Sequence, residues 1–179
     1  MSNALNPIGY VTQPEQAAKI GRGVVMLRKM ACRIKDERQR DDHFKASFAF
    51  WNFSQLFDDL VDNSGWDAQK KLLALRGLQD FVVALLANPV YRDHAGAFEG
   101  LFVTAIARVI AGDEFERSKD ARERALAPAI KCADIDVFAY FAHLAGGFDF
   151  MQEMGSRNEL RKYDFGDVKP ELKAEVACV

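Results

Sequence analysis

The sequence predicts an all-α protein, folded as a single-domain antiparallel helical bundle of about six helices. Apolar residues recur mostly at three- and four-residue spacing, which is the period of amphipathic helices. No alternating run bounded by turn residues indicates a strand. Segments with Gly, Asn or Pro separate the periodic stretches, and short loops favour antiparallel neighbours. We therefore predict a bundle domain over residues 1–157 and a polar C-terminal tail over residues 158–179.

The first two predicted helices differ in character. The first begins near Pro14, after a capping box formed by Thr12 and Glu15, and its apolar stripe continues to about residue 34. The second covers about residues 41–62 and is apolar nearly all round, which is typical of a central helix. The turn residues Asn63-Ser64-Gly65 then end it.

Two further helices are predicted on either side of an Asn-Pro step. The third covers about residues 67–87 and carries an apolar stripe of leucines and valines. Asn88 is expected to cap the fourth, with Pro89 in its first turn. This fourth helix is predicted to run to about residue 111, where Gly112 closes it.

The last two predicted helices contain possible interruptions. The fifth is a charged, solvated helix over about residues 113–127, and Pro128 is expected to interrupt or kink it. The sixth covers about residues 134–154. Its Gly146-Gly147 step predicts a kink or a close helix contact.

Composition and charge narrow the classes of partner. The 24 Lys and Arg residues against 26 Asp and Glu give a net charge of −2, which argues against nucleic acid as the main partner. No run approaches the roughly 20 apolar residues of a membrane span, so we expect no membrane contact. The cysteines Cys32, Cys132 and Cys178 lack metal spacing and are predicted to be thiols in a reducing compartment. We therefore predict a cytoplasmic protein.

His143 follows an apolar helix face and is predicted to be a core histidine.

An aspartate cluster ends the second predicted helix. Asp58, Asp59 and Asp62 lie at i, i+1 and i+4, so Asp58 and Asp62 share one helical face. They occupy the last turn, where the helix dipole disfavours negative charge, and they follow the most apolar stretch of the chain. Buried carboxylates need a partner charge or a metal, and Mg²⁺ accepts one or two carboxylates together with phosphate oxygens. The cluster therefore predicts a Mg²⁺ site, and the alternative is a solvated, helix-ending turn.

The cluster also brings a known family into view. Asp58-Asp59-Leu60-Val61-Asp62 resembles the first aspartate-rich motif, DDxxD, of class I isoprenoid (terpenoid) synthases. The resemblance implies an isoprenoid-synthase-like helical fold in which the three aspartates bind Mg²⁺ ions that hold a diphosphate ligand. The metal would stabilise the charge that develops on the leaving diphosphate.

Members of that family usually carry a second acidic motif as well. The nearest candidate here is Asp149 with Glu153, again at i, i+4, as a possible second metal site. The alternative for this pair is a solvated helix face. The resemblance implies binding of Mg²⁺ and a diphosphate, whereas it leaves open whether the protein is an enzyme.

A second resemblance implies a different function. Residues 135–154, together with the aspartate cluster, are similar to small helical proteins carried by phages and prophages, which imply no known chemistry. The alternative hypothesis is therefore a non-enzymatic helical interaction or accessory protein, possibly of phage origin. An apolar helix set of this kind could also form the interface of a homodimer.

Overall fold

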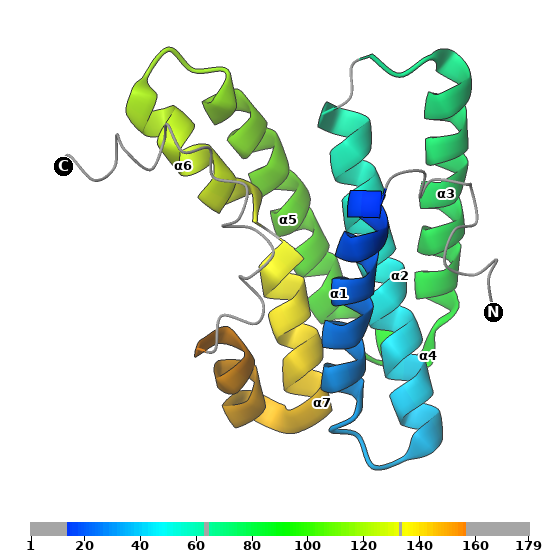
Figure 1. The fold of residues 1–179 in the computed structure, drawn as a ribbon. Helices are drawn as coiled ribbons and strands as arrows, with labels where there is room; N and C mark the ends of the chain where they lie inside the picture. The colour runs from blue at the N-terminus through cyan, green and yellow to red at the C-terminus, as the bar shows by residue number, and fades with distance from the viewer. Residues whose placement is uncertain (1–13, 63–64, 133, 157–179) are drawn as a thin grey trace. The chain divides into compact units, whose positions relative to one another are not determined.

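The computed structural model describes residues 14–62, 65–132 and 134–156, and every regular element in these ranges is a helix (Figure 1). Six of the helices have 11 residues or more, and one short helix has five. The predicted all-α class is therefore confirmed. The predicted tail at residues 158–179 and Thr12 of the expected capping box lie outside the described residues.

The described chain divides into two compact units, within residues 1–94 and 95–179. The first unit contains α1 (Pro14–Ala31), α2 (Glu37–Asp62), α3 (Ala68–Ala87) and α4 (Pro89–Asp93). Within it, α2 packs against α1, α3 and α4, as expected of the central helix. The α2–α3 pair forms a helical hairpin (Figure 1). The single-domain bundle stays a prediction.

Apolar side chains hold the first unit together at two places. In the α2–α3 hairpin, Leu56, Ala74 and Leu78 are buried, and partly buried aromatic side chains pack around them. Between α1 and α2, a Cβ on Gly23 would lie only 2.6 Å from Cζ2 of Trp51, so the indole ring packs directly on the α1 backbone. Interiors packed this closely have no room for an added methyl group.

The start of α2 differs from the prediction. The helix begins at Glu37, about one turn earlier than expected, because the Asp36 carboxylate accepts a hydrogen bond of 2.8 Å from the Gln39 backbone N–H. Such a cap satisfies one of the orphan donors of a first helical turn. The Arg40 guanidinium then donates to the carbonyls of Ile34 and Lys35, which ties the preceding connection to the helix.

The cap at Asn88 was predicted correctly, and the third helix begins at Ala68, one residue after the expected start at Asp67. Asp67 precedes α3, and its carboxylate accepts a hydrogen bond of 2.7 Å from Lys70 N. Asn88 ends α3 and caps α4 through a 2.9 Å hydrogen bond from Val90 N. Its side-chain amide also donates to the Asp42 carbonyl at 2.9 Å, so this buried residue links the junction of α3 and α4 to α2.

The second unit contains α5 (Ala95–Glu116), α6 (Ala121–Lys131) and α7 (Asp134–Ser156), and α5 packs against both α6 and α7. The predicted fourth helix starts correctly at Pro89, but the prediction is wrong about its continuity and its end. A break at His94 separates α4 from α5, and α5 continues through Gly112 to Glu116. Gly112 is buried against α6, where a Cβ would meet Lys131 Cγ at 2.4 Å, so this glycine serves packing rather than termination.

The predicted fifth helix also starts later than expected. Asp120 caps α6 by accepting a hydrogen bond of 2.8 Å from Arg122 N, and the helix begins at Ala121. Pro128 lies inside α6, in its last turn and a half, and the helix continues to Lys131. Proline removes one donor and widens the turn without necessarily ending a helix.

The interruption expected in the last helix is confirmed. Gly147 has φ 76° and ψ −171°, a backbone conformation available essentially to glycine alone, and it kinks α7. His143, before the kink, is exposed, so the prediction of a core histidine is wrong. The buried histidine is His43 on α2, which is 1% exposed.

One helix in the described part of the chain, α5, is long and apolar enough to cross a membrane by length and composition alone. Gly, Ala and Thr residues are interspersed among its large apolar ones, so the helix does not stand out in the sequence as one apolar run. Few of its residues are buried. The expected absence of membrane contact and the cytoplasmic location both stay predictions.

Candidate functional site

The predicted metal ligands lie at the end of α2 in the first unit. Asp58 and Asp59 are both partly exposed and lie about one turn before the end of the helix. Asp62 is the last residue of α2, and its side chain lies outside the described ones. The last turn of α2 contains no basic residue, so the carboxylates add to the negative end of the helix dipole.

The first turn of α3 lies next along the chain, at the same end of the hairpin. Lys70 Nζ is 4.2 Å from the centre of the Trp66 ring, and the indole belongs to the apolar cluster around Leu56 and Leu78. A cation over an indole face is held by the ring quadrupole. The hairpin end therefore combines carboxylates on α2 with a positioned ammonium group on α3.

The two predicted metal sites lie on different helices, α2 and α7. Among the described side chains, no three His, Cys, Asp or Glu residues are grouped so that they could hold a metal ion, and the side chain of Asp62 is not one of those described. The possible second site lies on α7 in the second unit, where Asp149 is exposed and Glu153 is partly exposed. Both metal sites stay predictions.

A different feature of the first unit was missed by the sequence analysis: α3 is apolar on two faces. One face buries Ala74, Gly77, Leu78 and Leu85. The other, which we call the outer stripe, exposes large apolar side chains around Gln79. Its members are Leu72 (49% exposed), Leu75 (52%), Gln79, Val82 (39%), Val83 (58%) and Leu86 (50%).

Exposed apolar side chains on this scale are informative. Scattered surface leucines are ordinary, but a contiguous row of them on one helix marks a surface that another molecule covers. The signal was present in the sequence, because α3 has more large apolar residues than a single face can hold. The α5 helix shows a shorter row of the same kind at Val103, Ile106 and Ile110.

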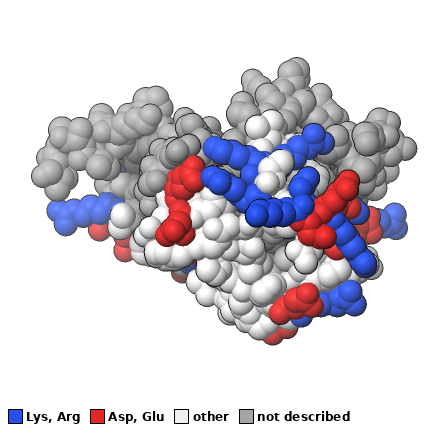
Figure 2. All heavy atoms as spheres, turned by 90° about the horizontal axis from the view of Figure 1, so that it is seen from below, with Lys and Arg blue, Asp and Glu red and all other residues white. Residues whose placement is uncertain are grey.

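A positively charged corner lies at the connection between α1 and α2. Arg28 and Lys29 are exposed in the last turn of α1, and Arg33, Lys35 and Arg38 are exposed in and after the connection. Figure 2 shows Lys and Arg side chains gathered on the face that carries this connection, with Asp and Glu side chains beside them. The net charge of the chain therefore conceals a local excess of positive charge.

Acidic side chains moderate this charged corner on α2. The Asp41 carboxylate pairs with Lys45 Nζ at 2.5 Å. Its hydrogen bond, followed by its charge, raises the pKa of Lys45 above the ordinary 10.5. Arg28 in turn lies 5.7 Å from the centre of the Phe44 ring, which restrains the guanidinium on the α2 surface.

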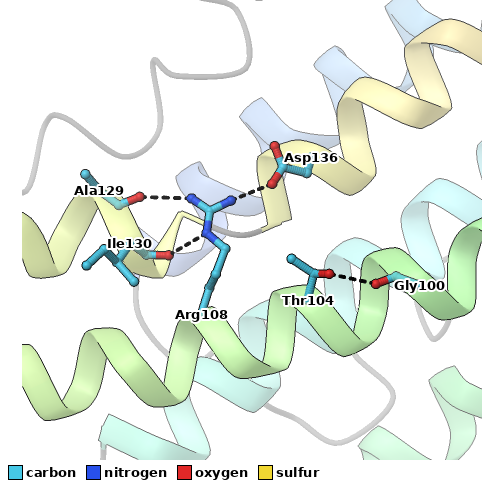
Figure 3. Close-up of polar contacts among 6 residues, drawn as sticks. All are labelled: Gly100, Thr104, Arg108, Ala129, Ile130 and Asp136. Atoms are coloured by element: carbon cyan, nitrogen blue, oxygen red, sulfur yellow. Dashed lines mark hydrogen bonds and ion pairs between the residues drawn. The ribbon is translucent and has the colours of Figure 1, made fainter.

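A second polar cluster joins the three helices of the second unit (Figure 3). The Arg108 guanidinium, from α5, donates to the carbonyls of Ala129 (3.1 Å) and Ile130 (3.2 Å) at the end of α6. Its third contact is with the Asp136 carboxylate in the first turn of α7. Because these contacts satisfy the orphan carbonyls of one helix end, the cluster is explained by the fold itself.

Comparison with known proteins returned no similar chain. No family model matches this sequence, and neither a curated protein nor a solved structure shows significant similarity to it.

Proposed function

We propose that this protein is a non-enzymatic helical interaction protein that binds a helix of its partner along the outer stripe of α3. The observation that carries the proposal is the exposure of Leu72, Leu75, Val83 and Leu86, each about half exposed, on a helix whose opposite face is already buried. Leu72 and Leu75, and likewise Val83 and Leu86, are spaced at i and i+3, as anchors in helix-to-helix recognition commonly are.

A site-specific photocrosslink in cells tests this function. A photoreactive amino acid at position 75 lies on the outer stripe, and the same residue at position 84 is exposed on α3 but outside the stripe. We expect a discrete protein to be crosslinked from position 75 and not from position 84. Equal labelling from both positions, or none from position 75, contradicts the proposal.

A second candidate function follows from the end of α2. We propose that Asp58, Asp59 and Asp62 bind Mg²⁺ and, through it, a diphosphate, in line with the resemblance to isoprenoid synthases. Support comes from partly buried carboxylates at the negative end of a helix that has no basic residue in its last turn, where a cation is electrostatically favoured. The Lys70 ammonium at the start of α3 provides positive charge for a diphosphate.

Titration calorimetry with Mg²⁺ and pyrophosphate tests this second function. We expect binding heat in the wild-type protein that is lost in Asp58→Asn and in Asp62→Asn. Asp80→Asn is the matched control, because Asp80 is exposed on α3 away from the hairpin end. Absence of heat in the wild type, or unchanged heat in Asp58→Asn, contradicts a metal site here.

A further inference from the structure

The outer stripe has the spacing of a coiled-coil seam. Leu72, Leu75, Gln79, Val82 and Leu86 follow one another at alternating steps of three and four residues. This spacing keeps a row of side chains facing a partner helix over two heptads. From Leu72 to Leu86 the rise is about 21 Å. The stripe therefore fits another helix lying alongside α3.

The sequence of α3 is also nearly symmetric about Gln79. Residues 72–75 read LLAL, and residues 83–86 read VALL, which is the same order reversed with one Leu replaced by Val. If two copies of α3 pack antiparallel with a two-fold axis at Gln79, Leu72 faces Leu86 of the second copy and Leu75 faces Val83 of the second copy. Such a surface is complementary to itself, as the interface of a two-fold dimer requires.

We propose that this chain forms an antiparallel two-fold homodimer in which the outer stripe of α3 packs against the same stripe of a second copy. The inference rests on the proposed interaction function and names the partner. Gln79 lies on the axis, where its amide both donates to and accepts from Gln79 of the second copy. A polar residue at one seam position is a known device for fixing register.

Charges beside the stripe favour the antiparallel arrangement. Arg76 and Asp80 are both exposed and lie on the same side of the stripe. In an antiparallel pair centred on Gln79, Arg76 of one copy and Asp80 of the other are separated by about 3 Å along the helix axis. A parallel, in-register pair would place Arg76 and Asp80 of the two copies on opposite sides of the interface, so this ion pair could not form between the copies.

The length of the stripe sets the expected strength. Stable complexes bury about 800 Å² on each partner, and a seam of two heptads is smaller than that. We therefore expect a dimer with a roughly micromolar dissociation constant, visible at high protein concentration.

Cysteine crosslinking tests both the interface and its direction. On the full chain with Cys32→Ser, Cys132→Ser and Cys178→Ser, we expect Gln79→Cys to form a disulfide-linked dimer by itself. Leu72→Cys alone should form none, because the two copies of position 72 would lie about 21 Å apart, far beyond disulfide reach. A mixture of Leu72→Cys and Leu86→Cys proteins should form a mixed dimer.

Sedimentation equilibrium of the unmodified chain gives an independent readout. At about 100 µM, above the expected dissociation constant, the wild-type mass should approach twice the 20.1 kDa of one chain. Leu75→Glu should stay monomeric with unchanged helical circular dichroism, because Leu75 is exposed. Ala84→Glu, on another exposed part of α3, is the matched control and should dimerise as the wild type does.

Specific outcomes overturn the homodimer. The homodimer is overturned if the wild-type protein is monomeric and Gln79→Cys forms no disulfide-linked dimer. It is also overturned if the Leu75→Glu protein dimerises normally. Efficient self-crosslinking of Leu72→Cys would show a parallel pair and overturn the antiparallel arrangement. If the purified chain is monomeric while position 75 crosslinks a different protein in cells, the homodimer fails and the interaction function stands. If position 75 crosslinks nothing, both fail.

Discussion

Single glycines determine how closely two helices of the second unit approach. An added Cβ on Gly112 would lie 2.4 Å from Lys131 Cγ and 3.2 Å from the Ala127 carbonyl oxygen on α6. Gly100, on the same helix, has no such neighbour within 4 Å. Both positions are glycines in the same helix. Comparing the same substitution at each therefore separates the effect of packing from that of helix propensity.

We predict opposite effects of Gly112→Ala and Gly100→Ala on the free energy of unfolding. Overpacking costs about 1–3 kcal/mol and outweighs the gain in helix propensity, so Gly112→Ala should destabilise the protein by about 1 kcal/mol. Gly100→Ala should stabilise it by about 0.5–1 kcal/mol. Urea unfolding followed by circular dichroism measures both. A stabilised Gly112→Ala protein would show that α6 can move away at no cost.

At the scale of helices, the caps and connections decide where each element begins and ends. The carboxylates of Asp36, Asp67 and Asp120 each accept a backbone hydrogen bond at a helix start. The end of α6 and the start of α7 instead share one guanidinium, that of Arg108. Three hydrogen bonds from one side chain suit the planar fork of arginine.

We predict that Arg108→Lys destabilises the protein more than Asp136→Asn does. Lysine cannot reproduce the two carbonyl contacts, so Arg108→Lys should lower the free energy of unfolding by about 1–2 kcal/mol. Asp136 is about half exposed, and solvent screens its ion pair, so Asp136→Asn should cost less than about 1 kcal/mol. Thermal unfolding of the two variants ranks them. The reverse order would mean that the ion pair, rather than the carbonyl contacts, holds α6 and α7 together.

At the scale of the whole chain, each unit has a core of its own. Leu56 packs with Ala74 and Leu78 in the first unit. In the second, the ring centres of Phe98 and Phe141 are 4.9 Å apart, and both side chains are fully buried. Local unfolding usually follows such separately packed regions.

We predict that a core substitution raises hydrogen exchange first in its own unit. Leu56→Ala should cost about 2–5 kcal/mol and increase exchange in α2 and α3. Phe141→Ala should cost about 3–5 kcal/mol and increase exchange in α5 and α7. Exchange measured by mass spectrometry on peptides separates the two patterns. A uniform increase along the chain in both variants would instead support the predicted single domain.

The all-α class and several boundaries were predictable because they depend on local signals. The period of apolar residues, the Asp67 and Asn88 caps, and the Gly147 kink are all encoded within a few neighbouring residues. Of the candidate sites, the sequence indicated the aspartate cluster by residue type and spacing, and the structure placed Asp58 and Asp59 partly exposed on α2.

Tertiary structure alone decided what depends on neighbours distant in sequence. Gly112 could have ended a helix, and only its contact with Lys131 shows that it packs α5 on α6. The near-symmetric stretch around Gln79 is visible in the sequence, yet only the burial of Leu78 and Leu85 on the opposite face shows which apolar side chains remain exposed. Periodicity marks an apolar face, whereas burial depends on which other helix arrives to cover it.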